Sequence, residues 1–324
     1  MEHRHSIDHR RRDGRRIVIR WLVAGAGQAG RCHVAAIQRT TNAELAGIID
    51  PMRPPDKDKP VYTDLSDALR ATEADAIVIA SPNDTQADLA HRALDAKLPV
   101  LCEKPVGKTR AEAEELHIHA KDAQVPLGVV LNQRAQTHSR WISELIENGA
   151  LIPQAVTFSG NLARLGGWHA DPTRSGGGVL RTIGLHYIDL LLWWLGQPID
   201  VKATLYGTPQ EDCINVTMTF SSGCTAQVKI YAVNEQADGP VICVIEDEGV
   251  RIDMAGHSIT AVKGLPDPPV AEPSDADLFF GPGHQTVITE ASRALQDGQP
   301  FPVPLSDVFP ALDVVGDIYA KVDR

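Results

Sequence analysis

The 324-residue sequence predicts a two-domain α/β protein: a doubly wound parallel sheet, then an α+β domain with an open, mostly antiparallel sheet. Strands and helices alternate from residue 17 to 134, which indicates a parallel sheet. After residue 134 the predicted strands follow one another without helices between them, which is typical of antiparallel sheets. The chain is also longer than one compact core usually extends. We expect a disordered tail at 1–16, one domain at 17–134 and a second domain at 135–324.

The composition is that of an ordinary globular protein, with 43% hydrophobic and 23% charged residues. A net charge of −11 argues against a nucleic-acid partner, because phosphate backbones require clustered Lys and Arg. The five cysteines are scattered and form neither a disulfide framework nor a CxxC pair, which favours the cytoplasm. No apolar run reaches the roughly 18 residues of a membrane span, so we expect no membrane association.

Residues 1–16 are rich in arginine, and Arg15-Arg16 precede the apolar residues 17–19. This pattern could indicate a twin-arginine export signal. Cleavage after it would delete the first predicted strand, so we favour a disordered basic tail or a misassigned start.

The first strand, 16–24, is followed by the glycine-rich turn Gly25-Ala26-Gly27-Gln28-Ala29-Gly30 and a helix to residue 39. A second strand, 44–49, ends at Asp50, 20 positions past the last glycine. This arrangement is the dinucleotide-binding fingerprint of a Rossmann domain, in which the glycine turn and the helix N-terminus hold pyrophosphate. Asp50 would accept hydrogen bonds from the ribose and repel a 2′-phosphate, so NAD is favoured over NADP. Arg53 leaves NADP as the weaker alternative.

Three further predicted strands each end in polar residues. Strand 75–80 precedes Ser81-Pro82-Asn83, strand 99–103 ends in Glu103-Lys104-Pro105, and strand 127–131 precedes Asn132-Gln133-Arg134. Intervening helices are expected at 64–70, at 84–96 and from Thr109, where a capping box starts. The carboxyl ends of parallel strands share one edge, where ligands bind. The residues expected to bind the cofactor are Gly25, Gly27, Gln28, Ala29, Gly30, Asp50, Ser81, Pro82, Asn83, Glu103, Lys104 and Asn132.

In the second half we expect helices at 139–148, 179–195, 284–296 and 310–322, and a loop at 166–174. The predicted strands are 154–165, 200–207, 213–220, 224–231, 241–246, 250–254 and 258–263. The helix 179–195 is expected to bury Leu190, Leu191, Trp193 and Trp194.

Four motifs occur together: the glycine turn, Ser81-Pro82-Asn83, Glu103-Lys104-Pro105, and Gly176-Gly177-Gly178 followed by Gly184-x-His186-x-x-Asp189. In this order they resemble the glucose–fructose oxidoreductase/inositol dehydrogenase/MocA (Gfo/Idh/MocA) family, over about residues 17 to 322. The resemblance implies an NAD(P)-dependent dehydrogenase that acts on CH–OH groups of sugars or inositols. It also implies that 135–324 is the substrate-binding and oligomerisation domain of a homodimer or homotetramer.

By this resemblance, Lys104 and His186 are the catalytic residues. Two positions depart from the family pattern: Thr182 stands where an Asp is frequent, and Gln86 where a His is frequent. Helical i,i+4 spacing would place residue 182 on the face of His186. His186 could instead be a buried structural histidine, and Asp189 could either orient it or form a salt bridge. The residues expected to contact substrate are Lys104, Arg134, Trp168, Thr182, His186 and Asp189.

The segments Gly167-Trp168-His169 and Thr182-Ile183-Gly184-Leu185-His186-Tyr187 resemble the branch of the family that oxidises UDP-N-acetylhexosamine uronates. An inositol or free sugar is the alternative substrate. A non-catalytic, dinucleotide-sensing regulator is the alternative function, and the presence of both Lys104 and His186 argues against it. No metal is expected, because the sequence has no HExxH motif and its HxH pairs lie in the tail and at His117-x-His119.

Overall fold

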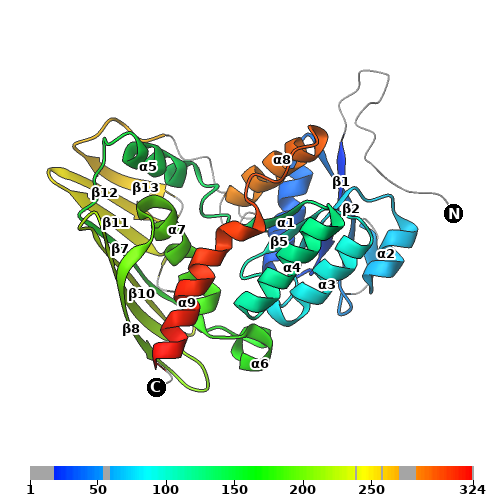
Figure 1. The fold of residues 1–324 in the computed structure, drawn as a ribbon, viewed down its shortest axis with the longest axis horizontal. Coiled ribbons are helices and arrows are strands. Elements are labelled where there is room, and N and C mark those ends of the chain that lie inside the picture. The colour runs from blue at the N-terminus through cyan, green and yellow to red at the C-terminus, as the bar shows by residue number, and fades with distance from the viewer. Residues whose placement is uncertain (1–17, 54–58, 238, 257, 270–281, 323–324) are drawn as a thin grey trace. The chain divides into compact units, whose positions relative to one another are not determined.

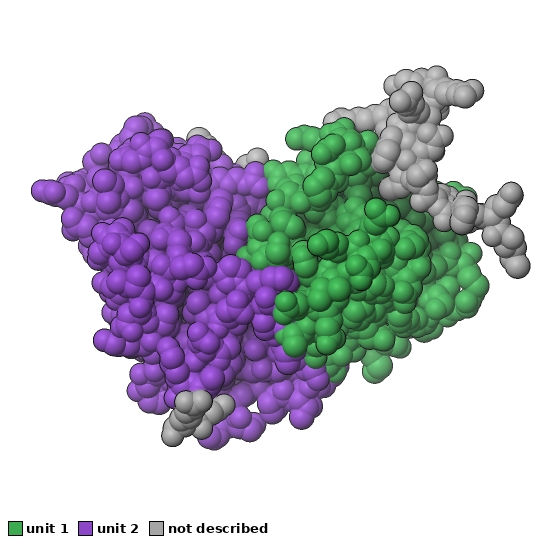
Figure 2. All heavy atoms as spheres, in the orientation of Figure 1, with its two compact units in different colours: residues 1–107, 111–132, 275–307 green, residues 108–110, 133–274, 308–324 purple. Residues whose placement is uncertain are grey.

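The computed structural model describes residues 18–53, 59–237, 239–256, 258–269 and 282–322. The predicted tail at 1–16 lies outside these ranges. The chain divides into two compact units (Figure 2). Unit 1 comprises residues 1–107, 111–132 and 275–307, and unit 2 comprises residues 108–110, 133–274 and 308–324.

The described part of unit 1 forms a six-stranded parallel sheet in the order β3-β2-β1-β4-β5-β6. Its strands are β1 Ile19–Ala24, β2 Ala43–Ile49, β3 Val61–Tyr62, β4 Ala76–Ile79, β5 Val100–Glu103 and β6 Leu127–Val130. This is the predicted doubly wound arrangement. The sequence did not predict β3, because a two-residue strand leaves no hydrophobic pattern. The strand order reverses between β1 and β4, so their carboxyl ends flank the point where doubly wound sheets bind ligands.

The helices of this part of the chain are α1 Gln28–Arg39, α2 Leu65–Ala71, α3 Asn83–Asp95, α4 Arg110–Ala123 and α8 Gly283–Gln296. Helix α8 lies in unit 1, although the sequence placed all of 135–324 in the second domain. Its apolar face includes the buried Ile288 and Leu295, and its Ser292 hydroxyl accepts a 3.0 Å hydrogen bond from the indole N–H of Trp21. The Trp21 side chain lies in the centre of β1 and is fully buried. The chain therefore returns to unit 1 to complete the hydrophobic core around β1.

The described part of unit 2 contains a seven-stranded sheet in the order β13-β12-β11-β7-β10-β9-β8. Its strands are β7 Ala155–Ala163, β8 Pro198–Tyr206, β9 Cys213–Phe220, β10 Thr225–Asn234, β11 Ile242–Asp247, β12 Val250–Ala255 and β13 Ser258–Lys263. The β7–β10 pair is parallel and the other pairs are antiparallel, as the mostly antiparallel prediction requires. Alternate residues of β9, such as Val216 and Met218, are fully buried. Within this unit, α5 Thr137–Glu147, α7 Leu185–Leu195 and α9 Phe309–Val322 lie on one side of the sheet (Figure 1).

Three details of unit 2 correct the sequence analysis. The predicted loop 166–174 contains a 3₁₀ helix at Gly167–Ala170 and the start of a short helix α6 at Pro172–Ser175. The predicted helix 179–195 begins as a π-helical segment, Leu180–Gly184, before α7. Trp193 is only half-buried, whereas Trp194 is buried and its indole N–H donates to the carbonyl oxygen of Ser139 at 3.1 Å. Adjacent helical residues point in different directions, so one tryptophan of the pair enters the core and the other does not.

Within the described ranges, no helix combines the length and apolar character that crossing a membrane requires.

Candidate functional site

The turn after β1 requires glycine at two positions. Gly25 has φ +101°, and a Cβ atom there would lie 2.5 Å from the carbonyl oxygen of Ala80. A Cβ on Gly30 would lie 1.9 Å from the carbonyl oxygen of Gly25. A Cβ on Gly27, in contrast, would meet no described atom within 4 Å. Gly25 and Gly30 therefore pack tightly against other backbone atoms, whereas the space beside Gly27 is open and a ligand could approach the backbone there.

Helix α1 begins directly after this turn, at Gln28, and its N-cap residue Gly27 supplies no side-chain cap. The first N–H groups of a helix have no partner within the helix, and the helix dipole places positive charge there. This end of α1 fits the pyrophosphate of a dinucleotide. Gln28 and Ala29, both predicted to bind the cofactor, form the first turn of α1 together with Gly30.

Asp50 follows β2, and each of its carboxylate oxygens accepts a hydrogen bond from a backbone N–H group. Its Oδ2 accepts from the N–H of Ala26 in the glycine turn at 2.8 Å, and its Oδ1 accepts from the N–H of Met52 at 2.9 Å. Asp50 thus holds the turn in place. Its contact with the ribose stays a prediction.

Gln86 on α3 joins two loops at the carboxyl edge of the sheet. It is 2% exposed; its Oε1 accepts from the N–H of Gly107 at 2.8 Å, and its Nε2 donates to the carbonyl oxygen of Ser81 at 3.3 Å. One amide side chain therefore links the Ser81-Pro82-Asn83 loop to the segment that follows Lys104-Pro105. The sequence analysis noted Gln86 only because a histidine is frequent at this position, and it did not predict the linking role. An amide side chain can donate and accept hydrogen bonds at the same time, which is what this role requires.

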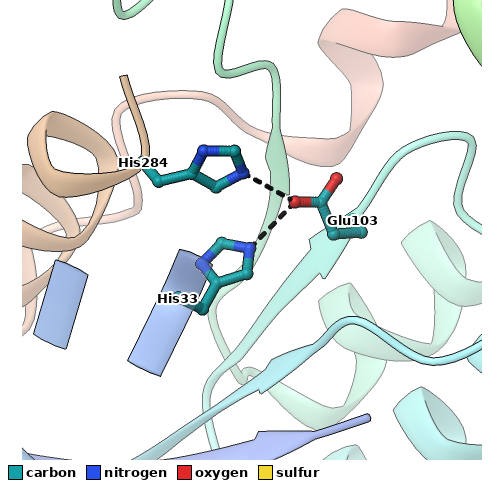
Figure 3. Close-up of side chains that lie close together, drawn as sticks. All are labelled: His33, Glu103 and His284. Carbon is teal, nitrogen blue, oxygen red and sulfur yellow. Dashed lines mark hydrogen bonds and ion pairs between the residues drawn. The ribbon is translucent and has the colours of Figure 1, made fainter. Parts of the chain in front are cut away.

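Glu103 was expected to contact the cofactor, but the structure surrounds it with protein side chains. It is 7% exposed, and its Oε1 lies 2.8 Å from Nε2 of His33 on α1 and 3.2 Å from Nε2 of His284 on α8 (Figure 3). Burial alone would raise the pKa of Glu103, but hydrogen bonds from the two histidines outweigh burial and hold it well below its usual range. Burial also lowers the pKa of His33. The sequence analysis missed both histidines, because only the fold brings them together.

Lys104 is the next residue, and its peptide bond to Pro105 is cis. Burial lowers the pKa of Lys104 to about 8, and the charge of Glu103 opposes this shift. An amine with that pKa can accept or release a proton near neutral pH. After β6, Asn132 is 3% exposed, and its Oδ1 has no hydrogen-bond partner among the described residues. Buried polar atoms usually have a partner, so Asn132 fits a role in binding a ligand.

In unit 2, two of the predicted substrate residues form an ion pair. The guanidinium of Arg134 donates to both carboxylate oxygens of Asp189, at 2.8 and 2.6 Å, and Asp189 is 1% exposed. The guanidinium carbon also lies 5.7 Å from the ring centre of Trp193. Asp189 therefore forms a salt bridge with Arg134, and its role in orienting His186 stays a prediction.

The other predicted residues of unit 2 lie near the π-helical segment or in the preceding loop. The Thr182 hydroxyl donates to the carbonyl oxygen of Gly178 at 2.9 Å, inside the π-helical segment. The segment that carries Thr182 is π-helical and not regular α-helix, and a shared face of Thr182 and His186 stays a prediction. His186 is half-buried and is the second residue of α7. In the preceding loop, the ring of Trp168 stacks on the ring of His169, with the ring centroids 3.7 Å apart.

Comparisons with known proteins agree with this architecture. Residues 19–131 match the family model described as an oxidoreductase family with an NAD-binding Rossmann fold, and residues 140–265 match the Gfo/Idh/MocA C-terminal domain. The chain is 24% identical to the rhizopine catabolism protein MocA of Rhizobium meliloti over 315 residues, 90% of this chain and 91% of that protein. It is 26% identical to the inositol 2-dehydrogenase of the same species over 58% of each chain.

Three uncharacterised oxidoreductases are matched over only 46%, 40% and 65% of their own length. Among solved structures, the WlbA dehydrogenase of Bordetella pertussis, in complex with NADH and UDP-GlcNAcA, has a TM-score of 0.79. It is 21% identical, and the match covers 95% of this chain and 96% of that one.

The two family models cover most of the described chain, and unit 1 has the glycine turn and parallel sheet of a dinucleotide-binding domain. The chain therefore belongs to the Gfo/Idh/MocA family of oxidoreductases and carries that family's NAD-binding Rossmann fold.

Proposed function

We propose that this protein is an NAD-dependent dehydrogenase that oxidises a secondary hydroxyl group of a sugar. The observation that carries the proposal is Lys104, which follows the carboxyl end of β5 in the NAD-binding unit. Its pKa is lowered to about 8 by burial, so it can act as a general base near neutral pH. The chemistry that bound NAD would supply is acceptance of the hydride from the carbon that bears the hydroxyl.

The chain's own residues have separate tasks in this proposal. The backbone of the glycine turn and the start of α1 bind the pyrophosphate, and Asp50 favours NAD by repelling a 2′-phosphate. Lys104 takes the proton of the substrate hydroxyl. His186 in unit 2 is proposed as a second acid–base group on the basis of its family motif.

For the substrate we propose a nucleotide-linked uronate. The segment Gly167-Trp168-His169 resembles the branch that oxidises such sugars, and the fold is similar to that of WlbA, which was solved with UDP-GlcNAcA. The similarity to an inositol 2-dehydrogenase favours inositol as the second candidate.

The test is to mix the protein with NAD and a panel of substrates and follow NADH absorbance. The panel contains a UDP-N-acetylhexosamine uronate, myo-inositol and free aldoses. We expect turnover with the UDP-linked uronate and a loss of about 10²–10⁴-fold in Lys104→Ala, the usual cost of removing an acid–base group. Lys121→Ala, an exposed lysine in the last turn of α4, is the control and should retain wild-type turnover.

Two results would count against the proposal. If inositol is the only compound that is oxidised, the proposed substrate is wrong, but the proposed dehydrogenase activity is correct. Tight NAD binding by calorimetry without turnover of any sugar would favour the dinucleotide-sensing regulator. A homodimer or homotetramer and a cytoplasmic location stay predictions, and light scattering would determine the oligomeric state.

A further inference from the structure

Glu211 lies in the loop between β8 and β9 of unit 2 and binds the start of the π-helical segment Leu180–Gly184. Its carbonyl oxygen accepts from the N–H of Val179 at 2.9 Å, and its Oε1 accepts from the N–H of Leu180 at 3.0 Å. The first N–H groups of a helix have no partner within the helix, so Glu211 supplies the bonds that this segment cannot make itself. Glu211 is 8% exposed, so little water is available to replace these bonds.

The carboxyl group of Glu211 is held in turn by α9 and lies close to the glycine motif. The hydroxyl of Tyr319 on α9 donates to the same Oε1 at 2.6 Å. A Cβ atom on Gly178 would overlap the carbonyl oxygen of Glu211, so only glycine lets the loop approach this closely. The carbonyl oxygen of Gly178 accepts from both the N–H and the hydroxyl of Thr182, at 3.0 and 2.9 Å. The contacts of Glu211 are therefore continuous with those of Thr182.

Gln210, the preceding residue, binds the segment that follows Trp168. Its Nε2 donates to the carbonyl oxygen of His169, and its Oε1 lies 3.2 Å from the hydroxyl of Ser175 at the end of α6. An amide can donate and accept at the same time, so one side chain contacts both ends of the segment 169–175.

We propose that Gln210 and Glu211 are positioning residues for the reaction. Gln210 holds the segment that carries Trp168. Glu211 holds the segment that carries Thr182 and continues into α7, where His186 lies. Two adjacent side chains of one loop thus orient both segments of unit 2 whose residues are proposed to contact substrate. This inference deepens the proposed function and rests on it, because the roles of these residues toward a sugar are part of that proposal.

The first measurement is amide hydrogen exchange in cofactor-free protein, which does not depend on activity. In Glu211→Leu the N–H groups of 180–184 should exchange about tenfold faster, because a buried N–H loses its partner. In Gln210→Ala faster exchange is expected at 169–176 and not at 180–184. The amides of β9, such as that of Val216, should be unchanged in both variants, which separates a local loss of order from a general loss of stability.

A conservative variant and a second site test the contact itself. In Glu211→Gln the amide oxygen can still accept from Leu180 and Tyr319, so wild-type exchange should be retained. Tyr319→Phe removes one hydroxyl and should raise exchange at 180–184 about threefold, which tests the same contact if Glu211→Leu does not fold. Glu248→Leu is the control, at an exposed glutamate in the turn between β11 and β12.

The second measurement is turnover of a sugar that the wild type oxidises. Glu211→Leu should lower kcat about tenfold, because the segment next to His186 is loosened and misplaced reacting groups react slowly. Gln210→Ala should mainly raise KM, because the segment beside Trp168 is loosened. A general loss of stability would not divide the two kinetic constants between the two variants in this way.

Unchanged exchange at 169–176 in Gln210→Ala, or at 180–184 in Glu211→Leu, would overturn the inference. If Glu211→Leu does not fold, unchanged exchange in Tyr319→Phe would overturn it instead. Wild-type kcat and KM in both loop variants would also overturn it and leave the dehydrogenase standing. Faster exchange in the expected segments, without turnover of any sugar by the wild type, would refute the dehydrogenase and leave the holding of the two segments by this loop standing.

Discussion

Asp189 accepts two hydrogen bonds from the guanidinium of Arg134, at 2.8 and 2.6 Å, inside unit 2. The side chains are 2% and 14% exposed, respectively, so little water reaches the pair. A buried pair adds little net stability compared with apolar residues, but removing one partner leaves the other charge buried and uncompensated.

We therefore expect Asp189→Asn to lower the free energy of unfolding by about 3–5 kcal/mol, measured by urea denaturation. Asp200→Asn is the control, because Asp200 pairs with Lys202 at the surface of the same unit. Surface pairs contribute about 0–1 kcal/mol. If both variants lose the same free energy of unfolding, breaking the buried Arg134–Asp189 pair costs no more than breaking a surface pair, and the prediction is wrong.

Gln86 provides a second test, because it links two loops at the cofactor edge. Gln86→Leu leaves the N–H of Gly107 and the carbonyl oxygen of Ser81 without their partner, which costs about 1–3 kcal/mol. We expect NAD affinity to fall about tenfold by calorimetry. Gln86→His should retain most of the affinity, because an imidazole can also donate and accept. Gln299→Leu, at an exposed position, is the control, and an unchanged affinity in Gln86→Leu would contradict the linking role.

Asp50 should determine the choice of cofactor. A carboxylate facing a 2′-phosphate is a like-charge pair that costs several kcal/mol, so we expect NAD to bind about 100-fold or more tightly than NADP. Asp50→Ser should lower the ratio of NAD affinity to NADP affinity. It should also lower the NAD affinity itself, because the hydrogen bond to the N–H of Ala26 is lost. Asp67→Asn, at an exposed position of α2, should change neither the NAD affinity nor the ratio of the two affinities. Equal wild-type dissociation constants for the two cofactors would rule out this role.

The pH dependence of turnover should report Lys104. Its base form is required for hydroxyl oxidation, and its pKa is lowered to about 8. Below that value kcat/KM should rise about tenfold per pH unit, and above it the profile should level off. In the reverse direction the ammonium is the acid, so the rate should fall above about pH 8. A flat profile from pH 6.5 to 9 would exclude Lys104 as the titrating group.

His186 and Thr182 should differ in importance. Removing the imidazole in His186→Ala should cost about 10²–10⁴-fold in turnover with little change in NAD affinity. Thr182→Ala should stay within about threefold of wild type, because its hydroxyl already donates to the carbonyl oxygen of Gly178. His117→Ala on α4 is the control. A larger loss in Thr182→Ala than in His186→Ala would reverse the proposed roles.

Local geometry explains why much of unit 1 could be predicted. The positive φ of Gly25 and the close approach at Gly30 are steric requirements that only glycine meets, so the turn is visible in the sequence. The alternation of strands and helices follows from hydrophobic periodicity. Short or irregular elements carry no such pattern, which is why β3 and the π-helical segment before α7 were missed.

The sequence by itself determined the order of the longer strands and helices, the two sheet types and the dinucleotide turn, because each depends on residues close together in the chain. Only the tertiary structure decided which distant residues meet. His284 reaches Glu103 across 181 positions, Ser292 reaches Trp21 across 271, and Asp189 reaches Arg134 across 55. These contacts form because burial leaves each polar group without water, and the fold places a partner for it nearby. Local sequence patterns cannot show which partner that is.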